Sequence, residues 1–336
     1  MNAKAIIFGC AGTELTSAEI DFFTKTQPWG FILFARNMQT ETQVRQLTNA
    51  LRKTVKHQPH IFIDEEGGRV SRLRSIGGWI GPPAAAFYAS GQDMQLCQQA
   101  VRANYRAIGA RLAALGFTAD CAPVLDIPVR QADPIIGDRA FCNQAQQIIP
   151  LAKAAIDGLN DAGISEVIKH IPGHGRANVD SHLSLPVVST EHKMLSDTDF
   201  APFQALASAK MAMTAHIVYA ALDPDFPATT SPTIIQQIIR DEIGFDGLLM
   251  SDDLEMKALG GSLPMRARQA LAAGCDMLLH CSGDLAAMRL LADVVPALQG
   301  PALARARRAS PDTGSGNINP EQAILEAKNS FLALQH

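Results

Sequence analysis

Eight short apolar runs recur along the chain, and helical patterns separate them. Most of these runs lack the period-two alternation of a half-exposed strand, and their last residues are polar; they span residues 4–9, 30–35, 60–64, 118–125, 166–170, 212–216, 247–251 and 276–280. Strands that are apolar on both faces are typical of a parallel sheet covered by helices. Eight such strands alternating with helices favour an α/β fold, a single (β/α)8 barrel of the TIM type, over an open doubly wound sheet.

The segments between these runs carry the signals of helices. Thr40 is a candidate N-cap for a helix that runs to residue 56, and Ser231-Pro232 opens a helix that ends near Gly244. Other helical patterns span residues 93–115, 144–159, 265–273, 285–298 and 320–334. Only segment 309–317 (ASPDTGSGN) has the composition of a linker. We therefore expect a barrel domain over 1–308 and, over 309–336, a linker and a C-terminal helix packed on the barrel.

Composition excludes several classes of protein. The net charge of −4, from 29 basic and 33 acidic side chains, gives no general attraction to nucleic acid or an anionic membrane. No apolar stretch approaches the roughly 18 residues of a membrane-spanning helix. The six cysteines contain no CxxC pair and indicate a reducing compartment, while the apolar run before Cys10 is too short for a signal peptide. We expect a cytoplasmic monomer with neither nucleic acid nor membrane as partner.

Charged side chains follow several of the apolar runs. In a barrel the loops after the strands converge on one face, and active sites lie there. No GxGxxG or Walker pattern follows any strand, which argues against nucleotide binding. The candidates for chemistry at strand ends or in the following loops are Asp64, Arg72, Arg139, Lys169, His170, His174, Asp180, His182, His216, Asp252 and Asp253.

Several candidates also have a purely structural interpretation. Asp64 could begin a loop, and Arg72 alone is typical of a solvated charge. His216 ends an apolar run and fits a hydrogen-bonded core histidine equally well. For Asp253 we favour the cap of the helix after the seventh strand. Lys169 is harder to explain in this way, because a lysine is rarely buried without a partner.

The segment 169–186, KHIPGHGRANVDSHLSLP, resembles the signature of the family 3 glycoside hydrolases, in the bacterial β-N-acetylglucosaminidase branch. Segment 245–256 (FDGLLMSDDLEM) resembles the nucleophile segment of that branch. Segments 64–72, 122–126 and 136–139 match its other landmarks, in order, and the match extends from about residue 5 to residue 282. The chain departs from the usual residues at three positions without losing a group assigned to chemistry, namely Asp133, Ala140 and Ile171.

The resemblance implies a retaining, two-step displacement without metal or cofactor. Asp252 would attack the anomeric carbon, and His182, oriented by Asp180, would serve as acid and then as base. The implied substrate is small, a terminal N-acetylglucosamine on 1,6-anhydro-N-acetylmuramic acid bearing a peptide, which indicates a role in peptidoglycan recycling. The residues implied or proposed to bind the sugar are Asp64, Arg72, Arg139, Lys169, His170 and His216.

The glycines around His174 suggest a mobile segment. Gly173 and Gly175 would let the following residues swing over bound sugar, so that His182 reaches its position when the loop closes. Mobility of this segment is therefore a hypothesis about how the acid/base arrives.

Three other functions stay open at this point. A metal-dependent hydrolase on the same barrel would draw its ligands from His170, His174, His182, His216, Asp252 and His280. Against it, the chain has no HExxH helix and no His-x-His at the first strand. An N-acetylglucosaminide phosphorylase would use phosphate in place of water. A sugar-binding barrel without catalysis would not need Asp252 and His182.

Overall fold

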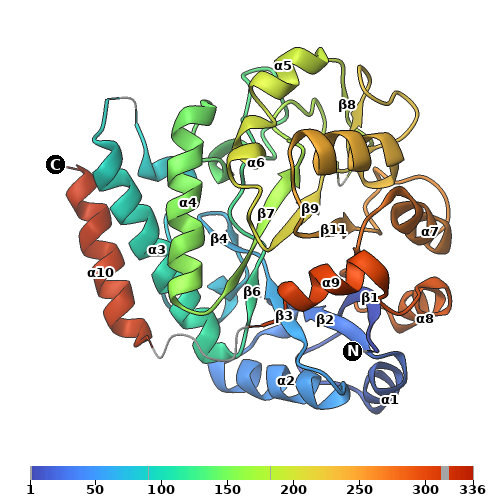
Figure 1. Ribbon diagram of the computed structural model, residues 1–336. Coiled ribbons are helices and arrows are strands. Elements are labelled where there is room, and N and C mark those ends of the chain that lie inside the picture. The colour runs from blue at the N-terminus through green and yellow to red at the C-terminus, as the bar shows by residue number, and fades with distance from the viewer. Residues whose placement is uncertain (1, 90, 182, 312–317, 336) are drawn as a thin grey trace.

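The computed structural model describes residues 2–89, 91–181, 183–311 and 318–335. Within these residues eight parallel strands close into a barrel, in the order β1-β12-β11-β9-β7-β6-β3-β2, and helices surround it (Figure 1). The expected (β/α)8 barrel is thereby confirmed. Its strands are β1 (Lys4–Gly9), β2 (Pro28–Ile32), β3 (His60–Ile63), β6 (Ala119–Asp120), β7 (Ser165–Ile171), β9 (Met211–Thr214), β11 (Leu248–Asp253) and β12 (Met277–His280).

Local capping explains where several helices begin. The side chains of Thr40 and Asp93 accept backbone N–H groups at the starts of α2 and α3, and Ser231 accepts from Ile234 ahead of η6. The sequence did not lead us to expect α1, α5, α6 and α9. The helices are α1 (Ser17–Thr26), α2 (Glu41–Thr54), α3 (Met94–Leu115), α4 (Ala145–Asp161), α5 (His192–Asp197), α6 (Ala201–Ala205), the π-helix η6 (Ile234–Glu242), α7 (Leu263–Ala273), α8 (Leu285–Val294), α9 (Gly300–Arg308) and α10 (Pro320–Leu332).

The fourth barrel strand is much shorter than the expected run over 118–125. Regular pairing in β6 stops at Asp120, three residues before Pro123, which has no N–H for a ladder. The chain nevertheless stays beside β7, because Leu125 donates its N–H to the carbonyl of Lys169. This irregular stretch brings Asp126 to the end of the barrel at which the carboxyl ends of the strands lie.

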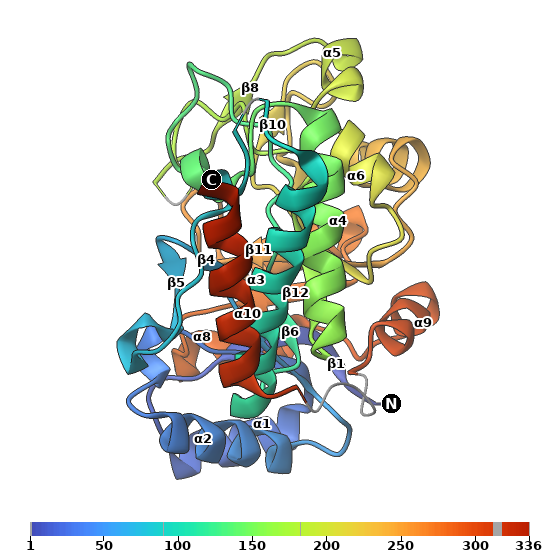
Figure 2. The same cartoon turned by 90° about the vertical axis from the view of Figure 1, so that its left-hand side faces the viewer.

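The C-terminal helix packs on the outside of the barrel. In Figure 2, α10 runs alongside α3, and the rings of Phe331 and Phe87 meet edge to face 5.2 Å apart. The division of the chain at residue 308 into two parts stays a prediction. None of the helices in the described ranges is long and apolar enough to cross a membrane.

Candidate active site

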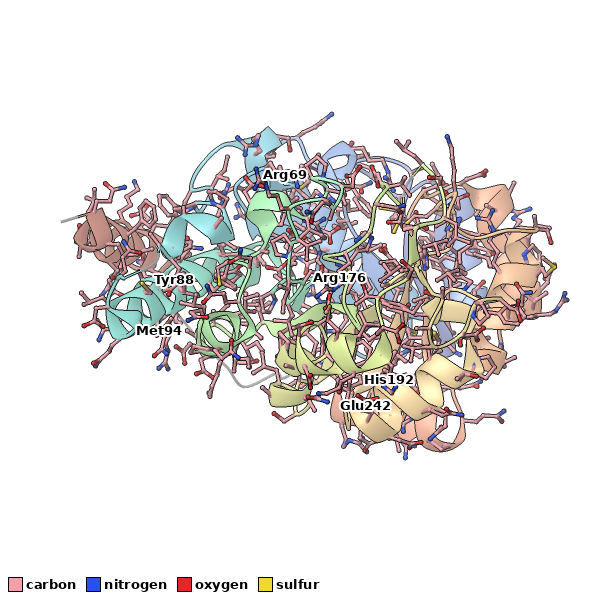
Figure 3. The ribbon with its side chains drawn as sticks, turned by 90° about the horizontal axis from the view of Figure 1, so that it is seen from above. Arg69, Tyr88, Met94, Arg176, His192 and Glu242 are labelled. Atoms are coloured by element: carbon pink, nitrogen blue, oxygen red, sulfur yellow. The ribbon has the colours of Figure 1, made fainter. Side chains whose placement is uncertain are left out.

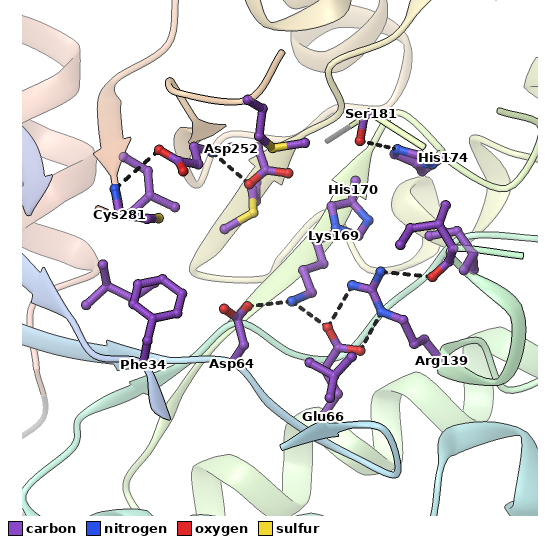
Figure 4. A pocket seen from close by; sticks show the side chains of 18 of the residues that line it. Phe34, Asp64, Glu66, Arg139, Lys169, His170, His174, Ser181, Asp252 and Cys281 are labelled. Carbon is purple, nitrogen blue, oxygen red and sulfur yellow. Dashed lines mark hydrogen bonds and ion pairs between the residues drawn. The ribbon is translucent and has the colours of Figure 1, made fainter. Parts of the chain in front are cut away.

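A cavity of about 400 Å³ lies among the ends of the barrel strands. Its wall includes Asp64 directly after β3, Lys169 and His170 near the end of β7, and Asp252 in the last part of β11. These side chains face one another in Figure 4, and Figure 3 looks onto the same end of the barrel from above. The volume is in the range of small-molecule sites. Strand ends that are far apart in sequence thus meet where a barrel places its chemistry.

A chain of ion pairs crosses the floor of this cavity. Lys169 Nζ lies 2.9 Å from Asp64 Oδ1 and 2.7 Å from Glu66 Oε1. The guanidinium of Arg139 donates two hydrogen bonds of 2.8 Å to the two oxygens of Glu66. Lys169 and Glu66 are 2% and 4% exposed, so both charges depend on these partners. Figure 4 shows the network as one connected line of side chains.

The ion pairs keep all these groups charged. Burial is the largest single effect and would raise the pKa values of Asp64 and Glu66, but the neighbouring cations together outweigh it. Lys169 and Arg72 hold the pKa of Asp64 far below its usual range, and Lys169 and Arg139 lower the pKa of Glu66 to about 2. Burial would lower the pKa of Lys169, yet Asp64 and Glu66 raise it. The cavity therefore presents fixed cations and anions to hydroxyl and amide groups of a ligand.

Acid should weaken the fold through this network. The pKa of Glu66 falls from an ordinary 4.5 to about 2, so between these values the folded protein binds fewer protons than the unfolded chain. The stability that Glu66 contributes is then present above about pH 4.5 and is lost as the pH falls toward 2. We expect the melting temperature to drop over this window, and Glu66→Gln to flatten the drop. Equally steep acid branches in thermal unfolding of both proteins would contradict the prediction.

Arg72 reaches the cavity from a small hairpin, β4 (Glu65–Gly67) and β5 (Val70–Ser71). Its Nη2 donates to Asp64 Oδ2 at 3.2 Å, and its guanidinium lies 5.5 Å from the ring centre of Phe34. Glu65 fixes the hairpin by accepting from the backbone N–H groups of Arg72 and Leu73. Arg72 thus lies on the cavity wall beside Asp64, and its role in binding stays a prediction.

A buried carboxylate, Asp126, organises the segment after β7. Its Oδ2 lies 2.7 Å from His170 Nδ1, and its Oδ1 accepts the backbone N–H groups of His170 and His174. His170 can therefore serve the cavity through Nε2. The ring of His174 in turn lies 3.1 Å, at Nε2, from the hydroxyl of Ser181. Burial, then the neighbouring His170, lower the pKa of His174 to about 4, which keeps it neutral at pH 7.

The glycines beside His174 allow close packing at the root of this segment. A Cβ on Gly175 would lie 1.9 Å from the carbonyl oxygen of Ile127, so no side chain fits there. Gly173 has a φ of 142°, and its carbonyl accepts from the hydroxyl of Tyr219. The sequence suggested hinges at these two glycines. In the structure both glycines allow close contacts, Gly175 with the carbonyl of Ile127 and Gly173 with Tyr219, and a swing of the segment stays a hypothesis.

Asp252 and Asp253 lie together at the end of β11, and both line the cavity. The N–H of Asp253 donates to Asp252 Oδ1 at 2.7 Å. Burial first, and then the charge of Asp252, raise the pKa of Asp253 to about 6. The expectation that Asp253 caps the next helix is wrong. That helix, α7, begins at Leu263, and Asp253 accepts the N–H groups of Glu255 and Cys281 instead.

His216 does not appear on the cavity wall. It is 1% exposed, with Nδ1 2.6 Å from Thr229 Oγ1 and Nε2 3.1 Å from the carbonyl oxygen of Asp253. Both ring nitrogens are therefore engaged by the protein. Of the two interpretations left open by the sequence, this geometry favours the hydrogen-bonded core histidine, which supports the end of β11 beneath Asp252.

Of the predicted acid/base pair, Asp180 and His182, the structure describes only Asp180. His182 lies outside the described residues. The carbonyl of Asp180 accepts the N–H groups of Leu183 and Ser184 in a turn, and Ser181 is buried on the cavity wall. The segment that carries the pair therefore reaches the cavity that holds Asp252.

In the described residues no group of three or more His, Cys, Asp and Glu side chains is placed to hold a metal ion. The ring centres of His170 and His174 lie 5.4 Å apart, but Asp126 binds one ring nitrogen of His170. Each thus has a partner within the protein.

Sequence reasoning gave no role to Glu66, Asp126 or Phe34, although all three matter to the site. Glu66 and Asp126 lie within segments that matched the family. The sequence held a signal for both residues, because three consecutive acidic residues follow one strand and an aspartate follows the next. Phe34 follows β2, whose end carried no charge to draw attention. An aromatic wall residue at a strand end has no sequence pattern that separates it from core.

The comparisons with known proteins agree with one another. The family described as "Glycosyl hydrolase family 3 N terminal domain" matches residues 13–307. A "Beta-hexosaminidase" of Alkalilimnicola ehrlichii is 40% identical over 285 residues, 82% of this chain and 80% of the relative. A "Beta-hexosaminidase" of Pasteurella multocida is 37% identical over 287 residues, 83% of this chain and 80% of the relative.

Solved structures show the same likeness. NagZ from Neisseria gonorrhoeae, in complex with N-trifluoroacetyl-D-glucosamine, superposes with a TM-score of 0.87 at 28% identity, covering 98% of this chain and 99% of the other. The same protein in complex with a zinc ion gives a TM-score of 0.86 at 26% identity, covering 98% of each chain. The resemblance found in the sequence is confirmed.

Proposed function

The chain belongs to glycosyl hydrolase family 3 and is a glycoside hydrolase, and from this premise we propose that it is a retaining exo-β-N-acetylglucosaminidase. Its beta-hexosaminidase relatives support activity on an amino sugar. The observation that carries the proposal is that Asp252 shares one cavity with the Asp64–Lys169–Glu66 ion pairs. A sugar bound to those groups would present its anomeric carbon to the carboxylate.

The proposed mechanism has two displacements. A carboxylate oxygen of Asp252 forms a bond to the anomeric carbon while the bond to the leaving oxygen breaks, and His182 gives that oxygen a proton. Water then attacks the glycosyl-enzyme, its proton passes to His182, and the bond to Asp252 breaks. Asp180 would accept a hydrogen bond from the other ring nitrogen of His182 and so fix its tautomer, as in the serine-protease triad. Two inversions leave the product with the configuration of the substrate.

For binding, we propose that the charged wall of the cavity holds the sugar hydroxyls and the N-acetyl group. Asp64 would accept from hydroxyls, while Arg72, Lys169 and His170 would donate. Because Arg139 already donates to Glu66 through Nε and Nη2, it would bind the sugar through its remaining N–H groups.

The biological substrate proposed is N-acetylglucosamine linked to 1,6-anhydro-N-acetylmuramic acid with its peptide, released in peptidoglycan recycling. This step, a cytoplasmic location and a monomeric state rest on the family resemblance and on the composition. Cleavage of that disaccharide by purified protein, against an N-acetylglucosamine disaccharide as comparison, tests the assignment. A clear preference for the second substrate would remove the recycling role.

Product analysis distinguishes hydrolysis from phosphorolysis. We expect free N-acetylglucosamine at the same rate in phosphate and in phosphate-free buffer, with the β-anomer appearing first in NMR spectra taken during the reaction. A sugar 1-phosphate as main product would favour the phosphorylase. The α-anomer as first product would refute the two-step route.

A chelator tests the metal-dependent alternative. Because every proposed step uses side chains alone, we expect activity to survive prolonged dialysis against a strong chelator. Loss of activity that added zinc restores would instead support a metal hydrolase. Inhibition by added zinc without any loss on dialysis would agree with our mechanism, because it would show no requirement for a metal ion.

A further inference from the structure

Glu66 joins two cations at the wall of the cavity, yet the mechanism above uses it in no step. Its side chain is 4% exposed. Oε1 lies 2.7 Å from Lys169 Nζ and accepts from Arg139 Nη2, while Oε2 accepts from Arg139 Nε. Lys169 and Arg139, two of the cations proposed to bind sugar, thus meet at one carboxylate.

We propose that Glu66 is a positioning residue that aims Lys169 and Arg139 at the substrate. The inference rests on the proposed function, because it takes both cations to be sugar-binding groups. Glu66 itself would act through them and would not need to touch the sugar.

The number of donors on each cation supports this role. An ammonium group has three N–H donors. Lys169 donates to Asp64 and forms an ion pair of 2.7 Å with Glu66. These two contacts hold the ammonium group in one place and orient the donors that remain for a ligand. Arg139 directs Nε and Nη2 to Glu66, and Nη1 lies 3.3 Å from the carbonyl oxygen of Ile135. Its guanidinium plane is thereby set, and only specific N–H groups are left for a ligand.

Electrostatics makes the carboxylate necessary at this point. Lys169 and Arg139 carry like charges and are only 2% and 11% exposed, so water screens their repulsion poorly. Glutamine would fill the same space as Glu66, but its amide nitrogen would face a donor of one of the two cations. At least one contact would break, and the long side chains would turn away from their present directions.

The rival explanation is that Glu66 only stabilises the fold. The barrel offers a matched control for it at the opposite end. Asp276, just before β12, is also 4% exposed and also joins two cations, Arg240 at 2.7 Å and Arg305 at 3.1 Å. A purely structural loss should therefore look alike in Glu66→Gln and Asp276→Asn.

The experiment compares these two variants well below their melting temperatures. Both should melt below wild type. For Glu66→Gln we expect weaker inhibition by N-acetylglucosamine and a kcat/KM for an aryl N-acetylglucosaminide that is lower by about 10²-fold, the scale of an ångström-size misplacement. For Asp276→Asn both values should equal those of wild type. Wild-type inhibition and kcat/KM in folded Glu66→Gln would overturn the proposal, as would equal kinetic losses in the two variants.

Crystal structures of the two variants give a readout that does not depend on the sugar. We expect Lys169 or Arg139 to leave its place in Glu66→Gln and to keep it in Asp276→Asn. Unmoved cations in Glu66→Gln would refute the positioning role by themselves. If wild type fails to bind N-acetylglucosamine, the proposed function falls instead, and the displacement still decides what Glu66 does.

Discussion

Asp252→Ala is expected to abolish turnover of every glycoside, with kcat lower by at least about 10⁴-fold. The loss should be the same for poor and activated leaving groups, because no other carboxylate is proposed to form the bond to the anomeric carbon. Steady-state rates on an alkyl and a dinitrophenyl N-acetylglucosaminide measure this. Near-normal rates on either substrate would show that Asp252 is not the nucleophile.

A small anion sharpens the test of Asp252. In Asp252→Ala the truncated side chain leaves room for azide on the face that the carboxylate occupied. Azide should then restore part of the rate with the activated substrate and give a glycosyl azide of inverted configuration. Asp253→Asn serves as the neighbouring control, since an amide oxygen can still accept from Glu255 and Cys281. A greater loss in Asp253→Asn than in Asp252→Ala would reverse their roles.

The barrel was predictable because its strands carry a strong signal. Strands such as β3 are buried along their whole length, and the sequence shows this as a short apolar run followed by charge. Capping by Thr40 predicted the start of α2 in the same way, and the helical spacing of apolar residues predicted α3. Helices α5 and α6 have 6 and 5 residues, too few for a periodic pattern to emerge, and were missed.

The cavity was predictable as a set of strand ends but not as a set of contacts. That Lys169 needed a partner followed from the cost of burying a lone charge. Which carboxylate it would meet did not follow, because Asp64, Glu65 and Glu66 are consecutive. The structure sends Glu65 to the hairpin and the other two to Lys169. The partner of His216 was not predictable either, because Thr229 lies in a short 3-10 helix (Ala228–Thr230) that no sequence pattern links to His216.

His182→Ala should separate the two steps of the reaction. With a poor leaving group we expect a loss of 10²- to 10⁴-fold, roughly the contribution of general acid catalysis. With a dinitrophenyl leaving group, which needs no proton, kcat/KM should stay close to wild type. The value of kcat should still fall, because water attacks the glycosyl-enzyme without a base, so a burst of the phenol should precede slow turnover. The control is His192→Ala. His192 in α5 is half-exposed and pairs with Glu242 in η6, so this variant should behave as wild type.

Azide again gives an independent readout for His182. It needs no base, so in His182→Ala it should speed the second step and yield a glycosyl azide of retained configuration, opposite to the product of Asp252→Ala. The two variants then place the two groups on opposite faces of the sugar ring. An equal loss of kcat/KM on poor and activated leaving groups in His182→Ala would assign proton transfer to another residue. The assignment of Asp252 as the nucleophile would still stand after that result, because the azide product of Asp252→Ala does not depend on His182.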